Sequence, residues 1–271
     1  MNNMIDSLRL LRRRLALVET RDRATRGTAG SVPVGHGAID HALGGGLMRG
    51  RLHELLAPAD DAGAASGFAA VLARLIGGDI MWVVDEALWR REGRLHPAGL
   101  AAIGLDPARL IIVLLPDVSA VLRAAVDGLR CSTLGSVVIA LPGDPRALDL
   151  TASRRLALAA EAGGVTALML RLGGKPLPSA AQSRWQVASA PSLPLAGASP
   201  GHPAWTLELL RQRGRPDGGR WCVEWDSEQA RLHDRDRAAA TIADGAALPR
   251  TVVSLSPGRS AARAGASRRI A

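Results

Sequence analysis

The chain has 271 residues, of which 47% are hydrophobic, and its formal net charge is +9. This length suits one large α/β domain with appendages, and with one Phe, no Tyr and six Trp the core must pack mainly on Ala, Leu and Val. No apolar run is long enough to span a membrane, and arginines at positions 9 and 12–14 argue against an export signal. Cys131 and Cys222 stand in no metal or disulfide motif, so we expect two inert, buried thiols in a reducing cytoplasm.

Residues 4–19 predict an amphipathic helix. Its apolar side chains recur at spacings of four and three residues, which is the narrow stripe of a helix that packs against another helix. The stripe consists of Met4, Leu8, Leu11, Leu15 and Val18. An isolated helix of this length is marginal in water, so the stripe needs a surface on its own domain or on a partner protein. We favour a partner, because the composition of residues 25–31 predicts a flexible linker. Helix and linker together occupy residues 1–30.

The next segment has the order of elements that precedes a phosphate loop. Residues 33–46 predict a short helix and a glycine-rich turn, and a strand follows at 51–56. A phosphate loop would then need Gly-x-x-x-x-Gly-Lys-Ser/Thr, whose amides, lysine and hydroxyl hold the phosphates and magnesium. The one lysine of the whole sequence is Lys175, far downstream.

The segment 57–67 therefore predicts a degenerate loop. The residues left at its positions are Pro58, Asp60, Asp61, Gly63, Ser66 and Gly67. The two aspartates would repel a triphosphate. We expect no ATP hydrolysis and no nucleotide cofactor.

Strands and helices alternate through the middle of the chain, as in α/β proteins. Strands are expected at 51–56, 80–84, 110–114, 137–141 and 167–172, and helices at 67–76, 97–103, 118–129 and 152–162. The strands are continuous runs of Val, Ile, Leu and Met, which is the pattern of strands that helices cover on both faces. A mostly parallel sheet with right-handed crossovers follows.

Beyond residue 173 the pattern changes. The segment 173–204 is rich in proline, although 183–188 could form a short strand. Polar and apolar residues then alternate at 204–210 and 220–225, on either side of a turn-rich loop, which predicts an antiparallel hairpin. We assign 31–255 to one core and 256–271, which is small, polar and rich in arginine, to a disordered basic tail.

Positive charge is concentrated at the two ends of the chain. Residues 1–30 hold seven arginines and three acidic residues, and residues 256–271 hold four arginines and no acid. The tail arginines are Arg259, Arg263, Arg268 and Arg269. Such an excess favours a polyanion or an acidic protein surface as partner, and plain solvated ends explain it equally well. These four arginines are our candidate DNA contacts, and any DNA affinity should be weak, electrostatic and salt-dependent.

The sequence predicts no other catalytic or metal site. Asp85 and Glu86 end a strand and suit the start of a helix better than catalysis, and Asp144 lies in a loop. His53 and Glu54 are neighbours in a strand, so they point to opposite faces. No set of Cys, His and carboxylate residues has metal-ligand spacing, and no nucleophile motif occurs. The six tryptophans could stack on bases, but their places in or beside predicted strands favour the core.

In order and spacing, these segments resemble the ImuA family, the RecA-like accessory proteins of bacterial inducible mutagenesis operons. The resemblance covers most of residues 31–226 and is carried by the segments 34–47, 49–55, 82–85, 104–111 and 221–225. It implies an α/β fold with a RecA-like core. That core would hold a mostly parallel sheet flanked by helices and an antiparallel C-terminal hairpin, with the N-terminal helix and the basic tail as appendages.

The same resemblance implies a non-catalytic role in SOS-induced, error-prone translesion DNA synthesis. The implied partner is ImuB, a catalytically impaired Y-family polymerase homologue. Through ImuB the chain would reach the sliding clamp and an error-prone replicative-type polymerase, in an assembled mutasome. Two other readings stay open: a regulator that acts on RecA or, like the SulA family, on cell division, and an atypical RecA-like ATPase. No membrane partner is expected.

Overall fold

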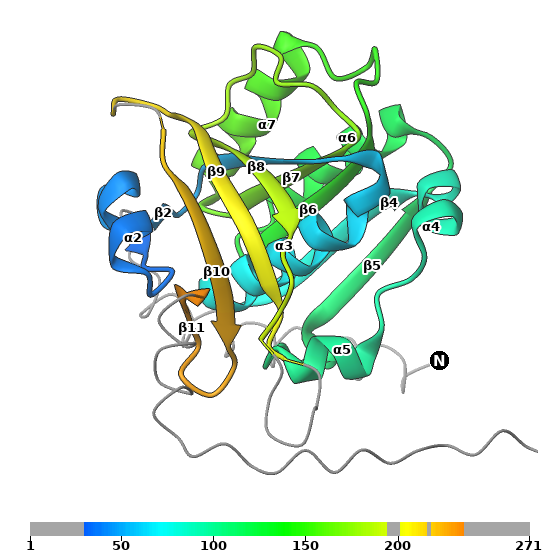
Figure 1. Ribbon diagram of the computed structural model, residues 1–271. Coiled ribbons are helices and arrows are strands. Elements are labelled where there is room, and N and C mark those ends of the chain that lie inside the picture. The colour runs from blue at the N-terminus through cyan, green and yellow to red at the C-terminus, as the bar shows by residue number, and fades with distance from the viewer. Residues whose placement is uncertain (1–29, 194–200, 216–217, 236–271) are drawn as a thin grey trace, which may run out of the picture.

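The computed structural model describes residues 30–193, 201–215 and 218–235, which fold around one nine-stranded sheet (Figure 1). The strand order is β11-β10-β9-β8-β3-β7-β6-β4-β5. The parallel part consists of β3 (Leu52–Ala57), β4 (Asp79–Asp85), β5 (Leu110–Leu115), β6 (Leu134–Pro142), β7 (Thr166–Leu172) and β8 (Ser183–Ser189). The sheet continues in antiparallel order through β9 (Ala204–Gln212), β10 (Arg220–Asp226) and β11 (Arg231–Asp234).

Helices cover both faces of the sheet, so one hydrophobic cluster lies on each side of it. One face carries α6 (Val118–Leu129) and α7 (Leu150–Gly163). The other carries α2 (Gly37–Leu43), α3 (Ala62–Ile76), α4 (Glu86–Glu92) and α5 (Pro97–Ala102). The short 3-10 helices η1 (Ala59–Asp61) and η2 (Pro107–Arg109) and a small sheet of β1 (Ser31–Val32) and β2 (Leu47–Met48) complete the described chain.

Aspartates start three of the helices. The carboxylates of Asp85, Asp117 and Asp149 accept hydrogen bonds from the amides three residues further on, at 2.9, 2.8 and 2.6 Å. Such capping satisfies a backbone N–H that has no partner inside the helix. At the far end of α2, Gly44 takes a left-handed conformation with φ of 84°, which ends the helix. These local signals are readable from sequence, and they set where strands give way to helices.

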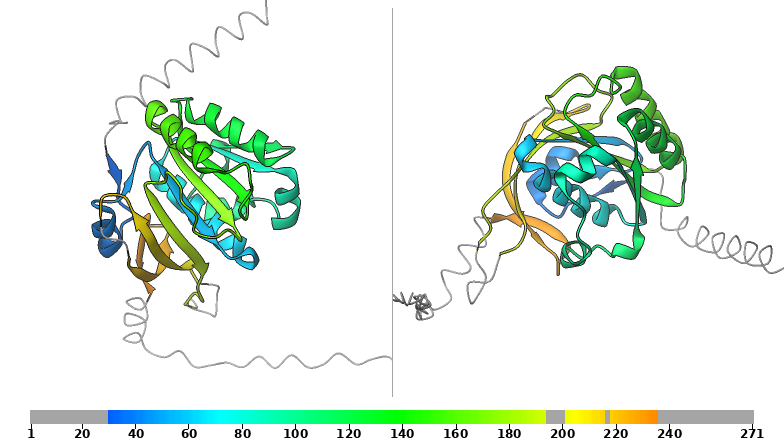
Figure 2. Two further views of the ribbon diagram at one scale, coloured as in Figure 1. Left: turned by 90° about the horizontal axis from the view of Figure 1, so that it is seen from above. Right: turned by 90° about the vertical axis from the view of Figure 1, so that its right-hand side faces the viewer.

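The antiparallel strands curve around the face that holds α2 and α3 (Figure 2). Two indoles tie this curved part to the helices. The Trp205 N–H donates to the Ala64 carbonyl at 3.0 Å, and the Trp225 N–H donates to the Ile103 carbonyl at 3.1 Å. Each indole thus buries its rings while its one donor finds a partner. The large aromatic side chains therefore fix the position of β9 and β10 over α3 and α5.

Most of the predicted elements are confirmed. Each expected strand overlaps an observed one, and the mostly parallel sheet with an antiparallel hairpin is present. The tryptophans belong to the core as expected: four are buried and two are half-buried. The sequence indicated a helix start at Asp85 and Glu86 without giving the extent of α4, and β11 was not expected. Within the described residues, no helix combines the length and apolar character needed to cross a bilayer.

Two expectations about burial are wrong. Strand β5 was expected to be covered on both faces, but Ile111, Ile112 and Leu114 are 52%, 40% and 45% exposed, because β5 is an edge strand with β4 as its only neighbour in the described sheet. Cys131 was expected to be buried but is exposed in the turn after α6, where its thiol contacts the Thr133 hydroxyl at 3.0 Å. Cys222 is half-buried.

Candidate functional site

The connection between β3 and α3 is a short turn and not a glycine-rich loop. Helix α3 begins at Ala62, well before the predicted start at residue 67, so Gly63, Ser66 and Gly67 lie in the helix. The prediction of a loop at 57–67 is therefore wrong for its second half. The physical reason is that this segment packs against β7, β8 and β3. Its alanines favour a helix, and Gly63 and Gly67 take no positive φ. Pro58, Asp60 and Asp61 do lie in the connection, the last two within η1.

This turn offers few backbone donors to an anion. A phosphate loop surrounds its ligand with consecutive N–H groups. Pro58 has no N–H, and the Asp61 N–H donates to the Pro58 carbonyl at 3.1 Å. The Asp61 carboxylate accepts the Ser189 N–H of β8 at 2.6 Å. Its negative charge is thus held next to the start of α3, where a phosphate would otherwise approach.

The turn after β7 packs against this connection. The Gly173 N–H donates to the Ala57 carbonyl at 2.8 Å. Gly173 has φ of +81°, and a Cβ placed on it would lie 3.1 Å from the Cβ of Ala59. The close approach of the two turns therefore requires glycine. The carboxyl ends of β3 and β7 are held together by backbone contacts.

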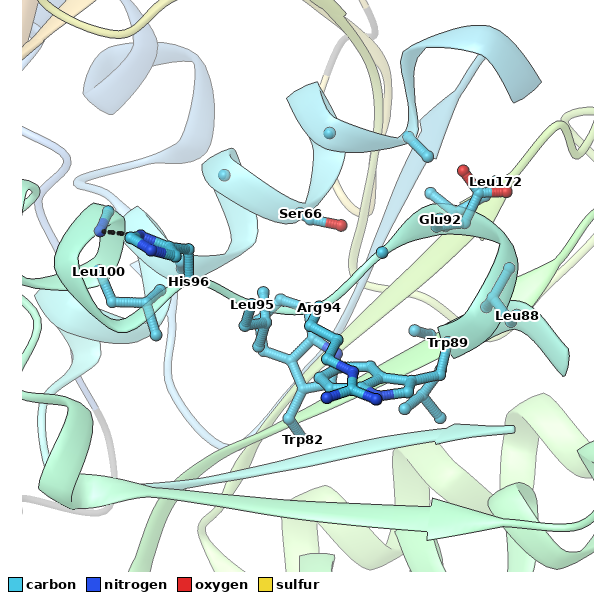
Figure 3. Close-up of a pocket in the computed structure, with 18 of the residues that line it drawn as sticks. Ser66, Trp82, Leu88, Trp89, Glu92, Arg94, Leu95, His96, Leu100 and Leu172 are labelled. Carbon is cyan, nitrogen blue, oxygen red and sulfur yellow. Dashed lines mark hydrogen bonds between the residues drawn. The ribbon is translucent and has the colours of Figure 1, made fainter. Parts of the chain in front are cut away.

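A pocket of about 300 Å³ opens beside the first turns of α3 (Figure 3). It lies between α3 and the chain from α4 to α5, with β4 and β9 contributing to its wall. The buried part of this wall is apolar and includes Trp82, Leu88, Leu100, Ile103, Leu172 and Trp205. The charged members, Glu92 and Arg94, are exposed, as is His96, whose Nδ1 accepts the Gly99 N–H at 3.3 Å. The pocket is an apolar recess with a polar mouth.

Three residues that were predicted to lie in the loop line this pocket instead. Gly63, Ser66 and Gly67 recur at the spacing of one helical face and line the pocket from α3. Sequence reasoning missed Trp89 and Arg94 as members of a site. A signal existed, since the segment 89–94 places an indole among arginines and a glutamate, which is an unusual setting for a core residue.

A second polar cluster lies on the opposite face of the sheet, beside β3, β7 and β8. Glu54 is fully buried and binds two guanidinium groups, Arg171 at 2.7 Å and Arg184 at 2.6 Å. The Ser179 hydroxyl donates to the same carboxylate at 2.8 Å. Asp144, expected in a loop, is there and pairs with Arg171. This cluster was not predicted, although Arg171 interrupts the apolar run of β7 and Glu54 that of β3.

His53 and Glu54 point to opposite faces of β3, as predicted. The Ser183 hydroxyl lies 2.7 Å from His53 Nδ1, and the Met48 carbonyl lies 2.8 Å from Nε2. The Trp185 indole donates to the same hydroxyl at 2.9 Å. The hydroxyl therefore donates to His53, which leaves the imidazole proton on Nε2. Burial lowers the pKa of His53 from 6.5 to about 4, although the bond to the Met48 carbonyl opposes the shift.

Asp85 has the helix-start role expected of it, because its Oδ1 caps α4. Its Oδ2 is buried without a hydrogen-bond partner in the structure. No three His, Cys, Asp or Glu side chains of the described residues gather as metal ligands do. The apolar stripe of Met4, Leu8, Leu11, Leu15 and Val18 and the arginines Arg259, Arg263, Arg268 and Arg269 lie outside the described residues.

Comparison with known proteins finds close relatives. The chain is 38% identical over 226 residues to Protein ImuA of Caulobacter vibrioides strain NA1000 / CB15N, a match that covers 73% of this chain and 86% of the relative. Protein ImuA of strain ATCC 19089 / CIP 103742 / CB 15 matches equally well. No protein-family model matches the chain.

The fold also has a solved counterpart. The crystal structure of the RadB recombinase superposes with a TM-score of 0.54 and covers 75% of this chain and 99% of its own, at 18% sequence identity. At this identity the likeness shows the fold alone, and it confirms the RecA-like core.

Proposed function

Because this chain belongs to the ImuA family, we propose that it is a non-catalytic accessory protein of damage-induced, error-prone translesion DNA synthesis. One observation supports the proposal that the chain is not catalytic. The turn between β3 and α3 has no lysine, and its Asp61 carboxylate is bonded to the backbone of β8 where a phosphate would approach. A nucleoside triphosphatase needs a phosphate cradle and a metal-holding acid in that place. The RecA-like core then serves as a scaffold for binding.

The partner we propose is an ImuB-type polymerase homologue. Through it, the sliding clamp and an error-prone replicative-type polymerase would be recruited to one assembly. Family membership supports this choice, and so does the apolar stripe on the predicted N-terminal helix. Full burial of Leu11 or Leu15 in an interface would contribute roughly 1.5–3 kcal/mol each, enough to decide a weak complex.

Catalysis is tested on the purified full-length chain with ATP and magnesium. We expect no release of phosphate above background. Magnesium-dependent turnover that disappears when Asp60 and Asp61 are changed to alanine would overturn the non-catalytic proposal.

Partner choice is tested by pull-down against the ImuB-type protein, RecA and the cell-division GTPase. We expect the ImuB-type protein to be retained. The double change Leu11→Asp with Leu15→Asp should abolish this binding, whereas Leu10→Asp with Leu17→Asp, off the stripe, should not. Retention of RecA or of the division GTPase in place of the ImuB-type protein would favour a regulator instead.

A further inference from the structure

The pocket beside α3 has walls that suit an apolar group and little else. Every lining side chain that is nine-tenths buried is apolar, among them the indoles of Trp82 and Trp205 and the side chains of Leu88 and Leu100. A polar metabolite or a nucleobase would bury donors and acceptors against these walls without partners, which costs free energy. The buried part of the pocket is therefore suited to a hydrocarbon or aromatic group.

The empty space comes from small residues on α3. A Cβ on Gly63 would meet no atom within 4 Å, and a Cβ on Gly67 would lie 3.5 Å from the Trp205 ring. Both glycines line the pocket from within the helix. The volume of about 300 Å³ is at the lower end of small-ligand cavities. It suits one bulky side chain, because an aromatic residue buries its rings in a recess of this kind.

The mouth of the pocket carries an uncommitted positive charge. On α4, Arg90 pairs with Glu86 at 3.6 Å and Arg91 pairs with Glu92 at 2.6 Å. Arg94, next along the chain, forms no ion pair or hydrogen bond through its side chain within the described residues, and it is exposed at the pocket. A carboxylate that approached the mouth would meet this guanidinium without displacing an existing partner.

We propose that this pocket receives a bulky apolar side chain, preferably aromatic, from a partner protein, and that an acidic residue beside it in the partner pairs with Arg94. The inference rests on the proposed accessory function, which supplies a protein partner. It places the contact on the core, at the end of α3 where a phosphate loop would bind nucleotide. An anchor residue in a desolvated pocket with a polar rim is how a few residues dominate an interface.

The chain offers a matched pair of variants. Gly63→Leu fills the pocket from a helical position that has open space, so the fold is kept. Gly37→Leu makes the same change at the first residue of α2, away from the pocket, where a Cβ likewise meets no atom within 4 Å. Arg94→Glu reverses the charge at the mouth. Melting temperatures of all three establish that each protein is folded.

Affinity for the ImuB-type protein is measured with each full-length variant. We expect Gly63→Leu to weaken binding by at least about tenfold, since it blocks the burial of one large side chain. Arg94→Glu should weaken it and make it less sensitive to salt, and Gly37→Leu should bind as the unchanged protein does. Unchanged affinity of Gly63→Leu and Arg94→Glu, with binding by the parent protein intact, would overturn the pocket while leaving the proposed function standing.

A second readout needs no partner. In ¹⁵N spectra of the full-length protein, 3-phenylpropionate should shift the indole signals of Trp82, Trp89 and Trp205 and not those of Trp185 or Trp225. Gly63→Leu should remove the effect, and the neutral amide of the probe should bind more weakly. If the parent protein binds no ImuB-type partner, these shifts still support the pocket, and their absence overturns it. Stronger shifts with adenosine than with 3-phenylpropionate would make it a nucleobase site and also overturn the proposal.

Discussion

At the scale of single residues, the buried carboxylate of Glu54 holds three strands together. It is 0% exposed and neutralises guanidinium groups from β7 and β8. A buried ion pair adds little over a well-packed apolar set, but removing one partner leaves an uncompensated buried charge. Substitution of any one member of the cluster should therefore lower the stability of the fold.

Glu54→Gln keeps the shape of the side chain and removes its charge. We expect the free energy of unfolding to fall by about 3–5 kcal/mol, because Arg184 stays buried without its counter-charge and Arg171 keeps Asp144 alone of its two carboxylates. Urea unfolding followed by circular dichroism measures the change. The control is Glu161→Gln, at the half-exposed pair with Arg51 at 2.7 Å, which should cost under about 1 kcal/mol. Equal effects of the two changes would contradict the role given to Glu54.

His53 makes stability depend on pH. Its pKa is about 4 in the fold and 6.5 when unperturbed, so between these values the unfolded chain binds a proton that the folded chain does not. The contribution is fully present above pH 6.5 and is lost as the pH falls toward 4, to a total of about 3 kcal/mol. Urea unfolding across this range should show the loss. His53→Gln should flatten that part of the curve, and an unaltered slope in the variant would assign the effect to other groups.

At the scale of elements, β5 is the edge strand of the described sheet beside β4, and its sequence lacks the residues that usually protect an edge. Three of its six residues are large, aliphatic and at least 40% exposed, and it contains no charge and no proline. Charged residues and proline commonly protect the edge strands of natural proteins. Without them, unpaired backbone groups beside apolar side chains can pair with a strand of another molecule. The sequence of β5 has the same apolar pattern as the buried strands beside it, which is why the sequence alone predicted it to be covered on both faces.

Ile112→Lys should reduce self-association of the protein. The lysine places a charge on the exposed edge and leaves the contacts of β4 in place, so the melting temperature should change little. Light scattering at rising protein concentration measures the effect. Leu158→Lys, at a 66% exposed position on α7, is the matched control and should leave self-association as it is. If both variants associate as the parent chain does, self-association does not occur through β5.

At the scale of the whole molecule, most of the net positive charge lies in the two terminal segments and not in the core. The residues 1–30 and 256–271 together account for +8 of the net +9, four from each end. The core between them is thus almost neutral. We therefore expect a polyanion to be attracted mainly to the termini.

Removal of residues 256–271 should leave the melting temperature nearly unchanged, because the segment contains four arginines and little apolar surface. Any DNA affinity should weaken, and the slope of log affinity against log salt should become shallower by about three to four. Fluorescence anisotropy with a labelled oligonucleotide at several salt concentrations measures both. A large drop in melting temperature would show that the tail is part of the fold.

Local pattern was sufficient for most of the fold. The apolar runs at 137–141 and 167–172 mark β6 and β7, and the helix at 118–129 matches α6 at both ends. It was insufficient at α3. From Ala62 the helix-forming alanines are interrupted by Gly63, Ser66 and Gly67, which weaken the local preference for a helix. Packing against β7, β8 and β3 decides for the helix.

By itself, the sequence determined the class of fold, the order of its elements and the absence of a lysine from the turn after β3. These follow from periodicity, capping residues and composition, which act over a few neighbours. Only the tertiary structure decided which strand is an edge, which charges are buried around Glu54, and that Trp82, Trp89 and Trp205 meet Gly63 in one pocket. These depend on contacts between residues far apart in the chain, and no local pattern records which distant side chain fills the space beside a given one.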